Sequence, residues 1–106
     1  MPTLREKNSA VNLAARRKNV LETLLNAHNS DVRNAEASLS TLVVDLAAAE
    51  LDDSVSDEVK RAKTLAKLNQ EDILVELRAT RESVSLRYNA AVTDLEAARA
   101  LVVEEE

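Results

Sequence analysis

The chain has no glycine in 106 residues, and this feature restricts its possible folds more than any other. Glycine supplies the positive φ that tight hairpin turns, bulges and many helix C-caps require, and glycine-rich loops bind phosphates in nucleotide-binding folds. A chain without glycine is therefore a poor match for most enzyme folds. Because only one residue is aromatic, leucine, valine and alanine must build the core, which suits close helix packing. The sequence predicts an all-α protein.

The composition also argues against cofactor and metal chemistry. The chain has no cysteine, which removes disulfides, zinc–thiolate sites, iron–sulfur ligation and thiol catalysis. Its single histidine cannot supply the paired Glu-x-x-His motifs of a di-metal helical bundle, and no nucleophile and base stand in a catalytic arrangement. We therefore expect a non-enzymatic protein with no cofactor and no metal.

The first helix is predicted to begin at Leu4. Thr3 and Glu6 stand three residues apart as in a capping box, where hydroxyl and carboxylate each accept a backbone N–H. From Leu4 onward, apolar residues fill eleven of the fourteen first and fourth positions of seven successive heptads. Lysine occupies two of the other three positions and His28 occupies the third. The pattern predicts one long helix over about residues 4–51.

The connection is predicted at about residues 52–56, where aspartate and serine compete with helix by hydrogen-bonding to the nearby backbone. Ser54 and Asp57 repeat the start pattern, so a second helix is expected over about residues 57–103. Four-residue steps between Asn69 and Leu77 predict a stutter in its heptads. The expected seam of this helix runs through Val59, Ala62, Ala66, Ile73, Leu77, Val84, Tyr88, Ala91, Leu95, Ala98 and Val102.

The two helices are expected to form a long antiparallel hairpin that is a single domain over residues 1–106. Poor helix formers leave a break open in each helix, near residues 28–31 and near residues 69–72. A turn centred near residue 55 brings together residues whose numbers add up to about 110. This register predicts an ion pair between Asp31 and Arg78.

Large apolar residues also lie off the predicted seam of both helices. They are Leu13, Val20, Leu24, Val43, Val44, Leu51, Leu65, Leu68, Leu74, Val75, Leu86, Val92 and Leu101. One pair of helices cannot cover so wide a stripe, and exposed apolar stripes mark association surfaces. We therefore expect a homodimer that forms a four-helix bundle, or another coiled-coil-like homo-oligomer. The residues expected to carry self-association are Leu21, Leu25, Val32, Leu39, Leu42, Leu46, Ile73, Leu77, Val84, Tyr88 and Leu95.

The polar candidates each have two interpretations. His28 either fixes the register of the seam or is a pH-sensitive position, because burial against a second copy penalises a charged imidazole. Two basic clusters could bind a phosphate backbone or an acidic partner, or could be solvated helix faces. They comprise Arg16, Arg17 and Lys18, and then Lys60, Arg61, Lys63 and Lys67. With no aromatic residue among them and a net charge of −5, nucleic acid is the less favoured partner.

The sequence predicts an interaction or scaffolding protein that binds itself and presents a helical surface to a protein partner. In composition it resembles small accessory and scaffolding proteins of bacteriophages and bacterial regulatory adaptors. The alternative is a small dimeric nucleic-acid-binding regulator that uses the basic clusters at 16–18 and 60–67. No stretch approaches the roughly 18 apolar residues of a membrane span, so no membrane partner is expected. The start of the chain has no apolar signal-peptide core, which predicts a cytoplasmic location.

Overall fold

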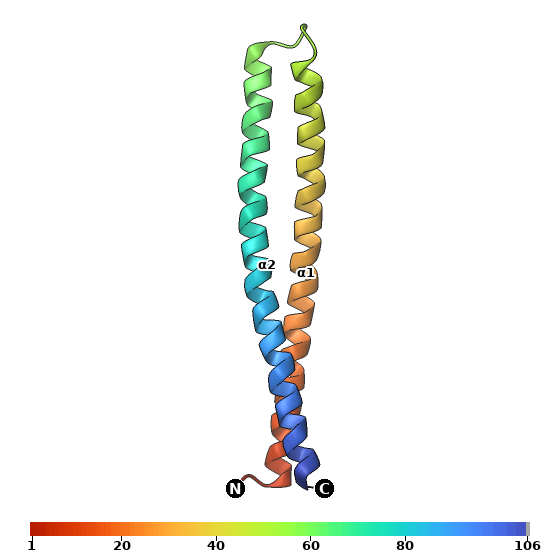
Figure 1. Cartoon of the computed structure of the whole chain (residues 1–106), viewed down its shortest axis with the longest axis vertical. Helices are drawn as coiled ribbons and strands as arrows, with labels where there is room; N and C mark the ends of the chain where they lie inside the picture. Colours follow the sequence, from red (N-terminus) through yellow and green to blue (C-terminus); the bar gives the residue numbers. More distant parts are fainter. Residues whose placement is uncertain (106) are drawn as a thin grey trace. The chain divides into compact units, whose positions relative to one another are not determined.

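The computed structural model describes residues 1–105 and shows two long α-helices joined by a short loop (Figure 1). Helix α1 is Leu4–Glu50 and helix α2 is Asp57–Glu105. No strand occurs among the described residues, so the predicted all-α class is confirmed. Residues 28–31 and 69–72 are both α-helical, and neither of the two open break positions interrupts its helix.

Hydroxyl caps begin both helices. The Glu6 N–H donates to Thr3 Oγ1 over 3.2 Å at the start of α1, as the capping pattern predicts. At the start of α2 the Val59 N–H donates to Ser56 Oγ over 3.2 Å. The predicted cap, Ser54, is therefore wrong, because Ser56 is the residue that directly precedes the helix and reaches its first free N–H groups.

The loop of residues 51–56 reverses the chain around Asp52. Both the N–H and the hydroxyl of Ser54 donate to Asp52 Oδ1, over 2.9 and 2.6 Å, and the Val55 N–H donates to the Asp52 carbonyl over 3.1 Å. The Ser54 hydroxyl, then its N–H, hold the pKa of the Asp52 carboxyl below its usual value of 3.8. No described residue has a positive φ, so this turn does without glycine.

The residues group into two compact units. The loop unit is His28–Thr80, and the terminal unit is Met1–Ala27 together with the described residues from Arg81 onward. Within each unit a part of α1 and a part of α2 run side by side in opposite directions (Figure 1). The loop of residues 51–56 closes the hairpin in the loop unit.

The core of the loop unit lies between its two helices. Val32 and Ala35 of α1 are buried against Leu74 of α2, with Leu39 and Leu77 packed at the edge of this cluster. Farther toward the loop, α1 buries Leu46 and Ala49 as well. The buried core of this unit is thus a single seam, as expected where two helices pack by heptads.

Two polar contacts cross between the helices of the loop unit. Gln70 Nε2 donates to the Ala35 carbonyl over 3.2 Å, and Arg78 Nη2 lies 3.8 Å from Glu36 Oε1. The structure therefore pairs Arg78 with Glu36 instead of the predicted Asp31. Both pairs join residues whose numbers add up to near 110, so the antiparallel register holds within this unit.

The terminal unit has a thinner core. Ala91 and Leu95 of α2 are its buried residues, and a row of half-buried side chains runs along both helices of the unit. The row comprises Lys7, Val11, Ala14, Lys18, Leu21 and Leu25 of α1 and Val84, Tyr88, Ala98 and Val102 of α2.

The predicted heptad of α1 is confirmed in both units. Every first and fourth position from Lys7 to Ala49 is half-buried or buried, and Leu4 at the end of the helix is the exception. The seam positions occupied by Lys18 and His28 follow the same rule. A lysine can do this because its methylene stem covers apolar surface while its ammonium reaches water.

Candidate interaction surfaces

The residues predicted to carry self-association lie mainly within the chain's own seam. Val32, Leu46 and Leu95 are buried. Those that are half-buried are Leu21, Leu25, Leu39, Leu42, Leu77, Val84 and Tyr88. Ile73 differs from the rest because 47% of it is exposed. Since ten of these eleven residues pack against their own chain, the surface available to a second copy lies off the seam.

The seam of α2 in the loop unit differs from the predicted one. Apart from Glu71, which is half-buried beside its ion-pair partner Lys67, its less exposed positions follow unbroken steps of three and four residues: Lys60, Lys63, Lys67, Gln70, Leu74 and Leu77. The predicted stutter is therefore wrong: Ile73 is on the exposed side, and Leu74, which the pattern places off the seam, is only 3% exposed. The regular register prevails because the partner seam on α1 keeps the heptad throughout the unit.

This register leaves an apolar stripe of α2 uncovered. The stripe consists of Val59, Ala62, Ala66 and Ile73, which are exposed and recur at helical spacing on one face. Beside its first three residues lies a groove of about 340 Å³, whose remaining lining is Leu42, Asp45 and Lys63. We call Val59, Ala62, Ala66 and Ile73 the loop-unit stripe. A stripe with two alanines lets another helix approach closely.

Exposed large apolar side chains occur in both units. In the loop unit they are Val43, Val44, Leu51, Val59, Leu65, Leu68, Ile73 and Val75. In the terminal unit they are Met1, Leu4, Leu13, Val20, Leu24, Leu86, Leu101 and Val103. Leu74 is the one predicted off-seam residue that the structure buries.

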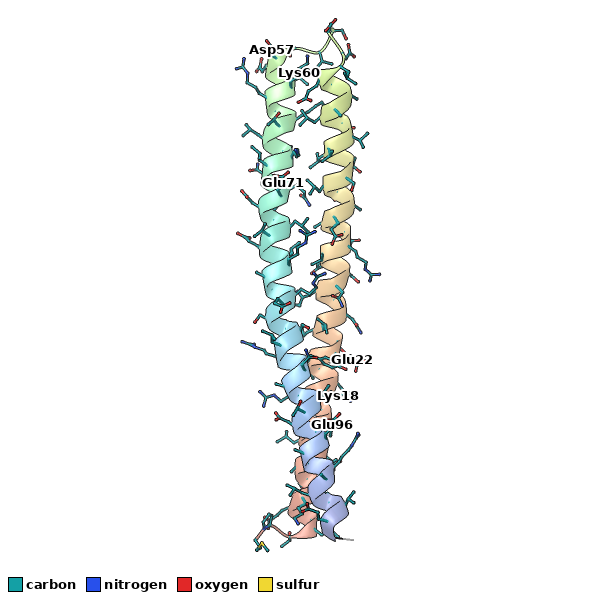
Figure 2. All side chains as sticks on the ribbon, in the orientation of Figure 1. Lys18, Glu22, Asp57, Lys60, Glu71 and Glu96 are labelled. Atoms are coloured by element: carbon teal, nitrogen blue, oxygen red, sulfur yellow. The ribbon has the colours of Figure 1, made fainter. Side chains whose placement is uncertain are left out.

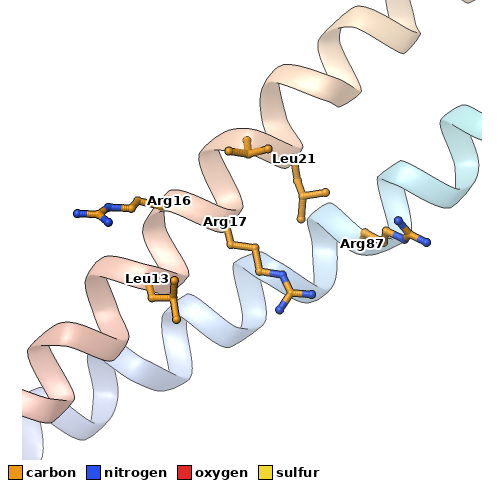
Figure 3. Close-up of a pocket in the computed structure, with 6 residues that line it drawn as sticks. Leu13, Arg16, Arg17, Leu21 and Arg87 are labelled. Atoms are coloured by element: carbon orange, nitrogen blue, oxygen red, sulfur yellow. The ribbon is translucent and has the colours of Figure 1, made fainter.

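A second groove, of about 690 Å³, lies in the terminal unit and has a different character. Three apolar and three cationic residues line it: Leu13, Val20, Leu21, Arg16, Arg17 and Arg87. In Figure 3, Arg17 reaches from α1 toward α2, Arg16 points away from α2, and Arg87 extends from α2 itself. We call this the arginine groove. Its guanidinium groups spread around an apolar strip instead of covering it.

The arginine groove continues along the same face. A smaller hollow of about 170 Å³ shares Leu13 and Arg17 with it and adds Ala10, Ala14, Ala91 and Asp94. The sequence predicted Arg16 and Arg17 as partner-binding residues but not Arg87. The antiparallel register, in which the numbers of paired residues add up to about 110, could have predicted that Arg87 lines the groove, because it places Arg87 near Leu21.

The two predicted basic clusters are only partly available to a partner. Lys18, Lys60, Lys63 and Lys67 are half-buried on the seams, while Arg16, Arg17 and Arg61 are exposed. Lys67 Nζ also lies 3.7 Å from Glu71 Oε1. Figure 2 shows Lys60 within the first turns of α2 and Glu71 farther along the same helix. The lysines that face the seam add little to a surface that would bind phosphates.

His28 occupies the predicted seam position. Its side chain is 25% exposed, and its Nδ1 lies 4.0 Å from Asp31 Oδ2, three residues along the helix. Nδ1 is buried and has no hydrogen-bond partner among the described residues. The two interpretations of His28, as a register residue and as a pH-sensitive position, both stay predictions.

No protein-family model, no curated protein and no solved structure matches this chain. Within residues 1–105, no three acidic or histidine side chains gather as a metal site would require. Over the same residues, neither helix contains a segment long and apolar enough to cross a bilayer.

Proposed function

We propose that this chain is a non-enzymatic assembly protein, which forms a homodimer through its off-seam apolar surface and presents its remaining helical surface to a protein partner. Its mechanism is the burial of apolar side chains that one hairpin leaves in water. The proposal includes the cytoplasmic location expected from the sequence, which fractionation of cells that express the tagged chain would test.

One observation carries the proposal: the exposed apolar set is larger than the core. Within the described part of the chain seven hydrophobic residues are buried, whereas sixteen large hydrophobic residues are exposed. The accessible surface is 7705 Å², about a third more than the roughly 5,800 Å² typical of a folded monomer of this mass. The excess, about 1,900 Å² per chain, is more than the roughly 800 Å² that each partner buries in a stable interface of standard size. Both quantities support association with a second copy.

The loop-unit stripe is the favoured centre of the dimer contact. Its two alanines allow close approach, while Val59 and Ile73 supply apolar area at the two ends of the stripe. In a twofold dimer the same stripe of both copies packs together, so one surface satisfies itself. Packing two hairpins in this way produces the four-helix bundle expected for helices with wide apolar faces.

Sedimentation velocity over a dilution series tests the proposal. We expect the full chain to change from dimer to monomer with a Kd in the range of about 1 to 100 μM. The double variant Val59→Glu/Ile73→Glu should be monomeric at every concentration, since it places four carboxylates in the twofold contact. The control Thr64→Glu/Thr80→Glu adds the same charge at exposed positions outside the stripe and should still form dimers.

Circular dichroism of both variants must show wild-type helix content for the comparison to count. A wild-type chain that stays monomeric at about 100 μM and above would contradict the proposed dimer. Equal dimerisation of the stripe variant and its control would show that another face makes the contact.

A further inference from the structure

We propose that the arginine groove binds an acidic amphipathic helix of a partner protein. The inference rests on the proposed function in one respect, namely that the chain presents a helical surface to a protein. It adds the location of that surface and the chemistry of what binds there.

The floor of the groove has the dimensions of a helix-binding site. Leu13 and Val20 are 68% and 59% exposed and lie two turns apart on one helix face. With the adjoining hollow, the groove extends from Ala10 to Leu21, which is about 16 Å at 1.5 Å per residue. A helix of about three turns fits this length. Helices that bind in grooves insert apolar residues at positions i, i+3 or i+4, and i+7.

The rim of the groove determines the charge of the occupant. Within the described residues, Arg16, Arg17 and Arg87 have no carboxylate within 4.0 Å, and none of the three makes a hydrogen bond. Three exposed guanidinium groups around an apolar strip complement a helix with leucine-type residues on one face and glutamates on its flanks. Arginine is suited to this role because its planar donors pair with carboxylates in a bidentate way.

The same residues disfavour the two other occupants. A phosphate backbone would leave Leu13 and Val20 in water and would find no aromatic side chain in the groove lining for base stacking. A second copy would need an acidic apolar face. The loop-unit groove, which lies beside the stripe proposed for self-association, combines Asp45 with Lys63 and so lacks the net negative charge that three arginines require.

Fluorescence anisotropy with a designed peptide tests the inference on the full chain. The probe is a fluorescein-labelled peptide of about four turns, with leucines on one face and glutamates on both flanks. We expect saturable binding with a Kd of about 10 μM at low salt, which weakens at least fivefold, approximately, as salt rises above the physiological range. A peptide with lysine in place of every glutamate should not bind.

Two groove variants and one matched control separate the contributions. Removing the rim charges or the apolar floor should each weaken peptide binding about tenfold or more. Removing three exposed arginines elsewhere should change the affinity by less than about twofold. The rim variant is Arg16→Gln/Arg17→Gln/Arg87→Gln, the floor variant is Leu13→Ser/Val20→Ser, and the control is Arg33→Gln/Arg61→Gln/Arg99→Gln.

Each contrary outcome overturns the inference in a recognisable way. Binding of the peptide that does not saturate below about 1 mM shows that the groove is not a site for acidic helices. The same conclusion follows if the rim variant and the control variant bind the peptide with equally reduced affinity. A duplex oligonucleotide that binds more tightly than the peptide through the same arginines assigns the groove to nucleic acid. If the groove variants abolish dimerisation and the peptide does not bind, the occupant is a second copy.

The test is independent of the proposed dimer. The stripe variant Val59→Glu/Ile73→Glu changes residues of the loop unit, whereas the arginine groove lies in the terminal unit. Peptide binding that persists in this monomeric variant supports the inference even if no dimer exists. Conversely, a dimer without peptide binding leaves the proposed self-association standing and removes the groove as a partner site.

Discussion

Replacing Ile73 and Leu74 separately by alanine tests the register of α2 in the loop unit. These neighbours have opposite environments: Leu74 is 3% exposed and packs in the core cluster, whereas Ile73 is 47% exposed. Apolar periodicity in the sequence predicts the reverse assignment, with Ile73 on the seam. The two substitutions therefore distinguish the structure from the pattern, and each variant serves as the control of the other.

The expected magnitudes follow from burial. Leu→Ala in a core costs about 2–5 kcal/mol, and a seam open on two sides lies at the lower end, about 2–3 kcal/mol. At Ile73 the lost burial is partial, and alanine regains about 0.4 kcal/mol through its higher helix propensity, so the net cost should stay below about 1 kcal/mol. For a chain of this length 1 kcal/mol corresponds to about 4–8 °C in Tm. The two costs differ by at least about 1 kcal/mol, so Leu74→Ala should melt at least about 4 °C below Ile73→Ala.

Thermal and urea unfolding followed by circular dichroism measure the difference. Both variants must be compared at a concentration where sedimentation shows monomers, because a dimer contact at Ile73 would add to its cost. If Ile73→Ala is destabilised as much as Leu74→Ala in the monomer, the heptad seam of α2 is wrong and the stuttered seam is restored.

Three smaller perturbations test single contacts. Thr3→Ala should cost about 0.5–1 kcal/mol by removing the cap of α1, seen as faster amide exchange in the first turn, whereas Thr3→Ser should keep the protection. The depressed pKa of Asp52 means that its stabilisation of the loop is present above pH 3.8 and is lost as pH falls through the folded pKa; carboxyl NMR of Ser54→Ala should show the midpoint returning toward 3.8, and an unchanged midpoint would contradict the assigned cause. His28→Leu should raise the free energy of unfolding by about 1 kcal/mol, seen as a higher urea midpoint, because it removes a buried nitrogen without a hydrogen-bond partner. A lower midpoint would show that this nitrogen has a hydrogen-bond partner in solution.

The regular elements could be predicted wherever local chemistry agrees with the packing. Thr3 caps α1 in the sequence pattern and in the structure, and the apolar heptads of α1 coincide with its less exposed face. The serine and aspartate residues of 51–56 mark the turn. Without glycine, the alternatives to a helical hairpin were already few.

The misassignments arose where seam positions are polar. In the loop unit α2 turns Lys60, Lys63, Lys67 and Gln70 toward α1, and a search for apolar residues passes over all four. Apolar periodicity assigns the exposed loop-unit stripe to the seam instead, and it then requires a stutter in the heptad to include Leu77. Lysine stems and a glutamine amide that finds a backbone carbonyl can serve as seam residues, but only the position of α1 shows that they do.

The arginine groove could be predicted only in part. Arg16 and Arg17 are visible as neighbours in the sequence, yet their meaning depends on Arg87, about seventy residues away, and on apolar residues that stay uncovered. Charge clusters in the sequence show which basic residues could bind a partner. The pairing of the two helices determines which of these basic residues lie beside exposed apolar side chains.

The unbroken alternation of three and four residues along the loop-unit seam limits how this hairpin can change in length. Inserting or deleting one residue rotates everything beyond it by about 100° around the helix axis, which would carry Leu74 and Leu77 away from Val32 and Ala35. Removal of seven residues from each helix, on either side of the loop, would shorten the unit by about 10 Å and preserve every remaining pairing. Variants in which both helices differ by seven residues should therefore keep this packing, and variants in which one helix differs by one or two residues should lose it.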